Sequence, residues 1–135
     1  MRCGAPAPRR VPDAALEYVA AFATGDPDAV AAWVTDGFVN EHTAALGSGC
    51  VGREEYRRRL PGFLSQFAGL RYDVEDVVRE GDKVVVAYRM TATHQGAPID
   101  IRGVMRMRVE DGRVAHRVDY WDALTFLRQA GLTTD

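Results

Sequence analysis

The sequence has little cysteine and almost no net charge. Only two of its 135 residues are cysteines, Cys3 and Cys50, and neither lies in a CxxC or His/Cys spacing typical of zinc sites. We therefore predict no disulfide framework, no metal and no cofactor. The formal net charge of -2 gives no electrostatic reason to expect nucleic acid or an anionic membrane as the partner. A small molecule is the expected partner.

Long apolar runs are also missing. No stretch approaches the ~20 apolar residues of a membrane-spanning helix. The first twelve residues, MRCGAPAPRRVP, contain arginines but lack the apolar segment of a secretory signal. We therefore predict a disordered tail over residues 1–12, one domain over residues 13–135, and a cytoplasmic protein. The hydrophobic content of 47% is ordinary for a domain of this size.

Helix signals dominate the first half of the chain. Asp13 is placed to cap a first helix, and Asp26 followed by Pro27 is typical of the start of a second. A third helix contains Pro61, which is expected to kink it. Between the second and third helices lie a short strand and a loop of small residues, AALGSGCVG, which is a candidate lid. The predicted helices cover residues 13–25, 26–36 and 53–69.

The second half of the chain alternates with a period of two, which indicates strands. Turn signals at Gly81-Asp82 and Asp111-Gly112 predict hairpins, and Asp122 is placed to cap a short final helix. The strand over 83–95 is apolar on both faces, which favours a homodimer through the outer face of the sheet. The predicted strands cover residues 38–43, 70–80, 83–95, 99–110 and 113–121.

Helices followed by an antiparallel meander predict an α+β fold, in which a cone-shaped, curved antiparallel sheet wraps around the N-terminal helices. The space between the two layers is a natural place for a small ligand. The question is then which polar side chains point into that space.

Three stretches, GREEYRRRL, REGDKVVVAYRMTATHQG and VEDGRVAHRVDYWD, together with the order of elements, resemble the SnoaL-like branch of the nuclear transport factor 2-like superfamily. The resemblance covers residues 13–131 and implies the cone-shaped α+β barrel. Related proteins include SnoaL-like polyketide cyclases, limonene epoxide hydrolase and ketosteroid isomerase. Because this fold hosts many activities, the site must decide the function.

Asp119 is the first candidate for chemistry. It lies seven residues after the turn glycine Gly112, where the resemblance places the catalytic aspartate of SnoaL-like cyclases and one of the two aspartates of limonene epoxide hydrolase. A carboxyl group in an apolar cavity can exchange protons near neutral pH, so we predict a proton-transferring Asp119. The alternative is a structural aspartate paired with Arg117 or Arg89.

Arg89 and Thr91 are the next candidates. By the resemblance, Arg89 occupies the position of the arginine that links the two aspartates of limonene epoxide hydrolase, and Thr91 replaces the second aspartate. Loss of that carboxylate weakens a strict epoxide-hydrolase interpretation. We predict that Arg89 orients Asp119 or binds a substrate carbonyl, and the alternative is a structural ion pair.

The short strand FVNEHT places Phe38, Asn40 and His42 on one face. This resembles the aromatic-x-Asn element of limonene epoxide hydrolase and the Asn-His pair of SnoaL-like proteins, so Asn40 and His42 are predicted catalytic residues. A register shift by one residue would instead turn Glu41 inward, where ketosteroid isomerase carries its base. The alternative role for Asn40 and His42 is to stabilise the mouth of the cavity.

Several other side chains are expected to contact the substrate. Tyr18 is placed to donate a hydrogen bond into the cavity, as a tyrosine on the same helix of ketosteroid isomerase does, although a core role competes with it. His116 is expected to face away from Asp119. The predicted substrate contacts are Tyr18, Trp33, Phe38, Glu41, Phe63, Thr91 and Trp121.

These residues predict a cofactor-free acid/base enzyme that acts on a small, mostly apolar metabolite of polyketide-type or other secondary metabolism. Cyclisation or isomerisation is the expected reaction, with Asp119 as the proton-transfer residue. One alternative is epoxide opening, in which Asp119 and Asn40 activate water. The other is a non-catalytic dimer that binds a small ligand, in which Asp119 would be fully ion-paired.

Overall fold

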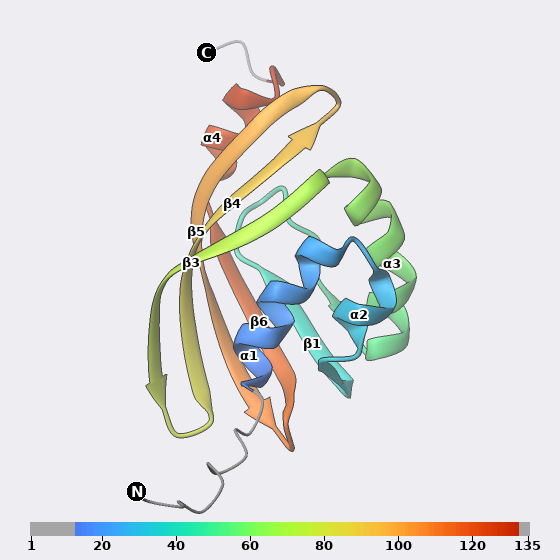
Figure 1. The fold of residues 1–135 in the computed structure, drawn as a ribbon, viewed down its shortest axis with the longest axis vertical. Helices are drawn as coiled ribbons and strands as arrows, with labels where there is room; N and C mark the ends of the chain where they lie inside the picture. The colour runs from blue at the N-terminus through green and yellow to red at the C-terminus, as the bar shows by residue number, and fades with distance from the viewer. Residues whose placement is uncertain (1–12, 133–135) are drawn as a thin grey trace, which may run out of the picture.

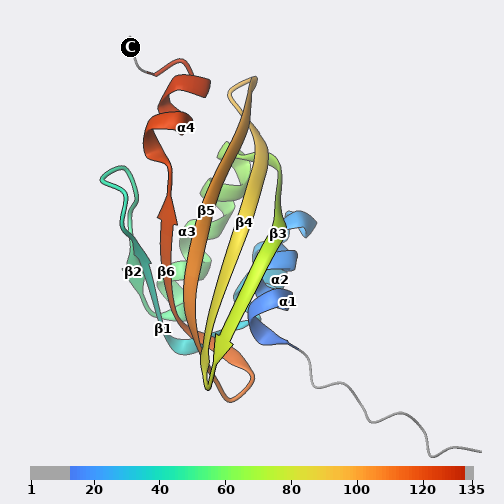
Figure 2. The same cartoon turned by 90° about the vertical axis from the view of Figure 1, so that its left-hand side faces the viewer.

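A six-stranded, curved and unclosed sheet forms one layer of the protein, and helices from the first half of the chain cover one of its faces (Figure 1). The computed structural model describes residues 13–132, so the predicted tail and Cys3 lie outside the described residues. The outer face of the sheet and the helices behind it are seen in Figure 2. This arrangement confirms the predicted α+β fold.

The helical segments are α1 (Ala14–Ala21), a 3₁₀ turn η1 (Phe22–Thr24), α2 (Pro27–Ala31), α3 (Arg53–Gln66) and α4 (Ala123–Gln129). The strands are β1 (Val34–His42), β2 (Cys50–Val51), β3 (Ala68–Glu80), β4 (Lys83–His94), β5 (Ala97–Glu110) and β6 (Arg113–Trp121). Their order across the sheet is β2-β1-β6-β5-β4-β3.

One strand pairing differs from the prediction of a wholly antiparallel sheet. β1 and β6 pair in parallel, and every other neighbouring pair is antiparallel. The register sets Asn40 beside Arg117 and His42 beside Asp119. Because β1 and β6 come from opposite ends of the chain, no hairpin forces them to be antiparallel. The parallel pairing brings two pairs of polar residues together.

Asp13 and Asp26 cap α1 and α2 as predicted, through bonds from the backbone N–H of Leu16 (3.1 Å) and Asp28 (2.9 Å). The second helix ends at Ala31, however, five residues before the predicted end at residue 36. The chain enters β1 at Val34, and the carbonyl of the preceding Trp33 accepts the Val114 N–H at 2.7 Å. Pairing with β6 therefore overrides the local helix signal.

The two later helices both contribute side chains to the lining of the cavity described below. α3 continues through Pro61 to Gln66 and buries Tyr56 and Leu60 against the core. α4 begins at the cap Asp122 as predicted. Its Gln129 side chain both accepts from the Asp100 N–H and donates to the Asp100 carbonyl, at 2.8 Å each, which fixes α4 against β5.

The outer face of the sheet carries ion pairs as well as apolar residues. Arg102 forms a bidentate pair with Glu75, and Val85 and Ala87 are half-buried on the same face. The homodimer through this face stays a prediction. Within residues 13–132, none of the helices has the length and apolar character needed to cross a membrane.

Gly103 provides a test of packing between β4, β5 and β6. It lies opposite Tyr88 on one side and Trp121 on the other. An added Cβ would overlap the Tyr88 hydroxyl and lie 2.7 Å from the Tyr120 carbonyl oxygen, which cannot move freely. We expect Gly103→Ala to lower the free energy of unfolding by about 1–3 kcal/mol in urea denaturation.

The matched control is Gly62→Ala on the exposed side of α3, where an added Cβ meets no atom within 4 Å. Alanine is more stable than glycine in a helix, so the free energy of unfolding of this variant should rise by about 0.5–1 kcal/mol. Equal effects of the two substitutions would contradict the packing described here.

Candidate functional site

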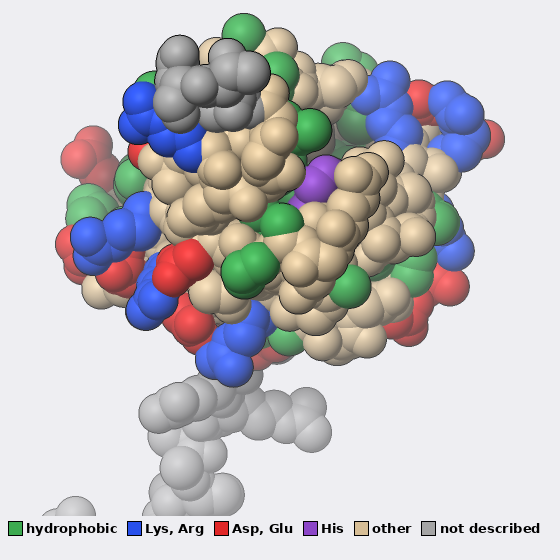
Figure 3. Space-filling view, turned by 90° about the horizontal axis from the view of Figure 1, so that it is seen from above, with side chains coloured by type: hydrophobic (Ala, Val, Ile, Leu, Met, Phe, Trp, Pro, Cys, Tyr) green, Lys and Arg blue, Asp and Glu red, His purple; other side chains and the backbone are tan. Residues whose placement is uncertain are grey.

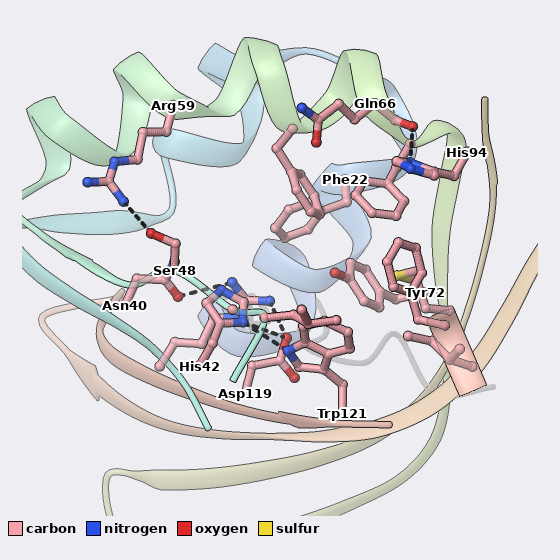
Figure 4. Close-up of a pocket in the computed structure, with 18 of the residues that line it drawn as sticks. Phe22, Asn40, His42, Ser48, Arg59, Gln66, Tyr72, His94, Asp119 and Trp121 are labelled. Carbon is pink, nitrogen blue, oxygen red and sulfur yellow. Dashed lines mark hydrogen bonds and ion pairs between the residues drawn. The ribbon is translucent and has the colours of Figure 1, made fainter. Parts of the chain in front are cut away.

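A cavity of about 500 Å³ lies between the helical layer and the sheet (Figure 4). Most of its wall is aromatic or aliphatic, with polar groups concentrated at β1, β6 and the loop before α3. Figure 3 is a view of the α4 end of the molecule and shows a surface groove in which a histidine side chain is exposed. The aromatic lining residues are Phe22, Tyr56, Phe63, Phe67, Tyr72, Tyr88, Trp121 and Phe126.

Asp119 and Arg117 form a buried ion pair at the wall of this cavity. Arg117 Nη2 lies 2.8 Å from Asp119 Oδ2, and the two residues are 4% and 3% exposed. The other carboxylate oxygen accepts a hydrogen bond from the Tyr88 hydroxyl at 2.7 Å. Both oxygens of Asp119 therefore accept hydrogen bonds, as an ionised carboxylate does.

Arg117 is held by groups from three other elements. Its Nη1 donates to Asn40 Oδ1 at 3.1 Å, and its guanidinium carbon lies 5.8 Å from the ring centres of both Tyr18 and Phe22. Burial acts to lower the pKa of Arg117, but the neighbouring Tyr18 and Asp119 outweigh it and hold that pKa well above its usual range. The guanidinium is a fixed positive charge.

β6 presents these groups because alternate residues of a strand share a face. Arg117, Asp119 and Trp121 all line the cavity, whereas His116 faces outward and lies 3.0 Å from Glu41. The predicted inward position of Asp119 and outward position of His116 match the structure. The pairing of Asp119 with Arg117, which the sequence left open as a structural alternative, is also present.

His42 lies directly beside the carboxylate. Its Nδ1 is 3.9 Å from Asp119 Oδ2 and accepts a hydrogen bond from Trp121 Nε1 at 3.2 Å (Figure 4). Burial and the nearby Arg117 charge lower the pKa of His42 from 6.5 to about 4, with Asp119 acting in the opposite direction. His42 is therefore neutral at physiological pH.

Tyrosine hydroxyls surround the same region. The Tyr18 and Tyr56 hydroxyls are 2.5 Å apart, and Tyr72 packs edge-to-face against Tyr88. Burial raises the pKa of each of these phenols, and the Asp119 charge raises that of Tyr88 further. All four therefore stay protonated at neutral pH and can donate hydrogen bonds.

The loop of small residues between β1 and α3 forms one wall of the cavity. An added Cβ at Gly47 would lie 2.8 Å from His42 Cγ, and one at Gly49 would overlap the Asn40 carbonyl oxygen. Arg59 on α3 holds the loop by donating to Ser48 Oγ (3.3 Å) and to the Gly49 carbonyl (2.9 Å). Close packing explains the small residues, and the lid function stays a prediction.

The structure corrects the predicted positions of Arg89 and Thr91. Arg89 lies on the exposed face of the sheet, where it forms a bidentate pair with Asp100. Thr91 lies on the same outer face and does not line the cavity. In a strand the two faces alternate, and the residues of β4 that line the cavity are Tyr88, Met90 and His94. The arginine beside Asp119 is Arg117.

Four other predicted cavity residues also lie elsewhere. Glu41 points to the outer face, which settles the register of β1 in favour of Asn40 and His42. Phe38 and Tyr18 are fully buried and pack against each other behind the cavity wall. Trp33 packs against the core and does not line the cavity. Asn40, His42, Phe63 and Trp121 line it as predicted.

Sequence reasoning gave no site role to the tyrosines Tyr56, Tyr72 and Tyr88, and it treated Arg117 only as a pairing partner. The polar lining residues Ser48, Arg59 and Gln66 were not assigned to the site either. The alternation along β6 already put Arg117 on the face of Asp119. Arginine is rarely buried, however, and nothing local indicates that aromatic rings and Asn40 would surround it. Within residues 13–132, no group of three or more histidine, cysteine, aspartate or glutamate side chains is arranged to hold a metal ion.

Several solved structures have the same fold as this chain. A ketosteroid isomerase-like protein from Catenulispora acidiphila, in complex with trimethylamine, has a TM-score of 0.82 and 19% identity, covering 92% of this chain and 96% of its own. A candidate polyketide cyclase from Bacillus cereus has a TM-score of 0.74 and 26% identity, covering 90% and 80%. An LEH-like epoxide hydrolase from M. tuberculosis has a TM-score of 0.74 and 20% identity, covering 87% and 90%.

The family follows from the sequence itself. The family model of the SnoaL-like domain matches residues 15–117, so the chain belongs to the SnoaL-like domain family. This confirms the resemblance inferred from the sequence. A search of curated protein sequences finds no match to the chain.

The lowered pKa of His42 predicts a stability that depends on pH. The unfolded chain binds a proton at His42 near pH 6.5, whereas the folded protein binds it only near pH 4. The stability that depends on a neutral His42 is therefore fully present above about pH 6.5 and is lost as the pH falls towards 4. The total loss in the free energy of unfolding is roughly 3 kcal/mol. Chemical denaturation across this range should show that the free energy of unfolding falls more steeply with decreasing pH for the wild type than for His42→Gln. His116→Gln, which leaves His42 in place, should keep the wild-type slope.

The buried ion pair predicts non-additive effects of substitution. Asp119→Asn leaves the Arg117 charge buried without its partner, so the free energy of unfolding should fall by about 3–5 kcal/mol. Adding Arg117→Met removes the orphaned charge and should recover most of that loss. Denaturation of both single variants and the double variant measures the coupling, and strictly additive losses would contradict a paired Arg117 and Asp119.

Proposed function

We propose that this protein is a cofactor-free acid/base enzyme that acts on a small, mostly apolar metabolite of polyketide-type or other secondary metabolism. Its reaction is a cyclisation or isomerisation, and the Asp119 carboxylate transfers the proton. One observation carries the proposal: the Asp119 carboxyl group, paired with Arg117, lies at the wall of a largely apolar cavity of about 500 Å³, a volume suited to a small organic substrate.

The arrangement suits Asp119 to act first as a base. Each carboxylate oxygen accepts one hydrogen bond from the protein and retains acceptor capacity for a substrate C–H. Asp119 would take a proton from a carbon next to a carbonyl group, so that the C–H electron pair forms an enolate. Return of the proton to another carbon isomerises the substrate. Attack of the enolate carbon on a second carbonyl closes a ring, and Asp119 then protonates the new alkoxide.

Asn40 supports this chemistry indirectly. Its side-chain oxygen accepts from Arg117 Nη1, while Arg117 Nη2 is bound to Asp119. Asn40 therefore fixes the orientation of the guanidinium and, through it, of the base. The aromatic wall makes the surroundings of the carboxyl group largely apolar and would hold a planar apolar substrate against it. The family and the 26% identity to a candidate polyketide cyclase support the same reaction class.

Epoxide opening is less well supported by the residues of the cavity. A water-activating pair of carboxylates needs a second acid, but among residues 13–132 Asp119 is the one acidic side chain that lines the cavity. By the resemblance, Arg89 and Thr91 correspond to the linking arginine and the second aspartate of limonene epoxide hydrolase. Both lie on the outer face of the sheet.

Non-catalytic binding of a small ligand is the second candidate, and the ion pair favours it. A structural role for Asp119 requires a partner for each oxygen, and Tyr88 and Arg117 provide one each. The two functions differ in what loss of the Asp119 charge does. A binding protein would lose affinity or stability, whereas an enzyme would lose turnover in a variant that still folds and binds.

Hydrogen–deuterium exchange tests the proposal without knowledge of the natural substrate. 2-Tetralone is an apolar bicyclic ketone with exchangeable hydrogens next to its carbonyl group. We expect the wild type to accelerate exchange at that carbon in D₂O, followed by proton NMR, and Asp119→Asn to reduce the acceleration by about 10²–10⁴-fold. Asp100→Asn, which makes the same change on the outer face, should match the wild type.

Two controls make the result decisive. The Asp119→Asn and Arg117→Met double variant reports activity in a protein that has no orphaned charge, and it should remain inactive although stable. Binding of 2-naphthol, a planar mimic of the enolised ketone, shows whether the cavity is intact. Binding by all variants with no exchange by the wild type would favour the non-catalytic function, and wild-type hydrolysis of styrene oxide would favour epoxide opening.

A further inference from the structure

Trp121 fixes the hydrogen-bonding state of His42. An indole N–H can only donate, so the His42 Nδ1 that receives it at 3.2 Å must carry a lone pair rather than a hydrogen. In a neutral imidazole the hydrogen then resides on Nε2. Because Trp121 follows Asp119 on the same face of β6, one strand sets both the base and the tautomer of its neighbour.

The competing states of His42 are disfavoured by the groups that face it. A hydrogen on Nδ1 would point at the indole hydrogen of Trp121, and the distance of 3.9 Å from Nδ1 to Asp119 Oδ2 is too long for a compensating hydrogen bond. The charged form meets the fixed positive charge of Arg117 in a buried setting. Burial, followed by Arg117, lowers the pKa of His42 to about 4.

The remaining ring nitrogen is available to a ligand. Nε2 of His42 makes no hydrogen bond to any side chain or backbone group of residues 13–132, and His42 lines the cavity. The site therefore sets a neutral histidine, whose Nε2–H has no partner among residues 13–132, next to the carboxyl group of the proposed base. Such a pair matches a substrate in which a C–H bond and a carbonyl oxygen lie next to each other.

We propose that Trp121 is a positioning residue that holds His42 as its Nε2–H tautomer, and that His42 donates this hydrogen to the carbonyl oxygen of an enolisable ketone or related carbonyl compound. The substrate class rests on the proposed function of Asp119. When Asp119 takes the α-proton, the C–H pair forms the carbon–carbon double bond and the carbonyl π pair moves to the oxygen. The His42 Nε2–H stabilises the negative charge on that oxygen, and no oxidant or other reactant is needed.

The tautomer is measured directly, with no substrate, by two-dimensional NMR of the histidine ring nitrogens at neutral pH, with His42→Gln used to assign the signals. We expect the Nε2–H pattern for His42 in the wild type. Trp121→Phe keeps an aromatic ring but removes the N–H, so it should produce a mixture with the Nδ1–H form. Trp33→Phe, the same change at a tryptophan away from the cavity, should leave the pattern unchanged.

An Nδ1–H or doubly protonated His42 in the wild type would overturn the positioning role, as would an unchanged tautomer in Trp121→Phe.

Exchange of 2-tetralone in D₂O tests the second half of the proposal. Loss of a whole hydrogen-bond donor to a developing oxyanion costs ~10²-fold or more in kcat, so His42→Phe should approach this loss and Trp121→Phe should show a smaller one, about tenfold. KM should change little, because the bond strengthens only as charge develops. Trp33→Phe should keep the wild-type kcat.

The two parts of the account fail in different ways. Full exchange activity in His42→Phe, together with loss of activity in Asp119→Asn, would overturn the role of His42 and leave the proposed function in place. A wild type with the expected tautomer but no exchange activity would overturn the proposed function and the carbonyl substrate class together.

Discussion

The buried ion pair between Arg117 and Asp119 is the interaction on which the rest of the site depends. Removing two charges from water costs several kcal/mol for each ion, and this cost must be offset by partners with good geometry. The direct contact of 2.8 Å, the Asn40 oxygen, the Tyr88 hydroxyl and the aromatic rings over the guanidinium provide them. The same partners bear on the proposed chemistry, because each oxygen of Asp119 accepts a hydrogen bond from one of them and the Arg117 charge helps to keep His42 neutral beside the carboxyl group.

The fold brings these partners together through one long-range pairing. The parallel contact of β1 with β6 sets Asn40 beside Arg117 and His42 beside Asp119, although 77 residues separate each pair in the sequence. Gly103 adds a local condition, since only the absence of its side chain lets the Tyr88 hydroxyl reach across β5 to Asp119. Strand register and one missing Cβ thus bring the polar groups of the site together.

Local signals predicted much of this architecture. The caps Asp13, Asp26 and Asp122 act as expected, and both predicted hairpin turns form. Alternation along β6 grouped Asp119 with Arg117 and Trp121 on one face, and the family resemblance assigned that face to the inside. Features that depend on distant partners were not predictable. The second helix ends early because β6 binds the chain from Trp33 onward. The family resemblance assigned Arg89 to the site, and the pattern of β4, which is apolar on both faces, did not point to Tyr88 instead. The burial of Arg117 requires groups from elements that no local pattern links.

The charge of Asp119 tests the account most directly. Carbon-13 NMR of the side-chain carboxyl at neutral pH, assigned by difference from Asp119→Asn, distinguishes a carboxylate from a carboxylic acid. The account predicts an ionised carboxylate whose resonance moves when Arg117→Met removes its partner. A protonated carboxyl group at neutral pH would contradict it, because a neutral carboxylic acid is too weak a base to take a proton from carbon and Arg117 would have no counter-charge.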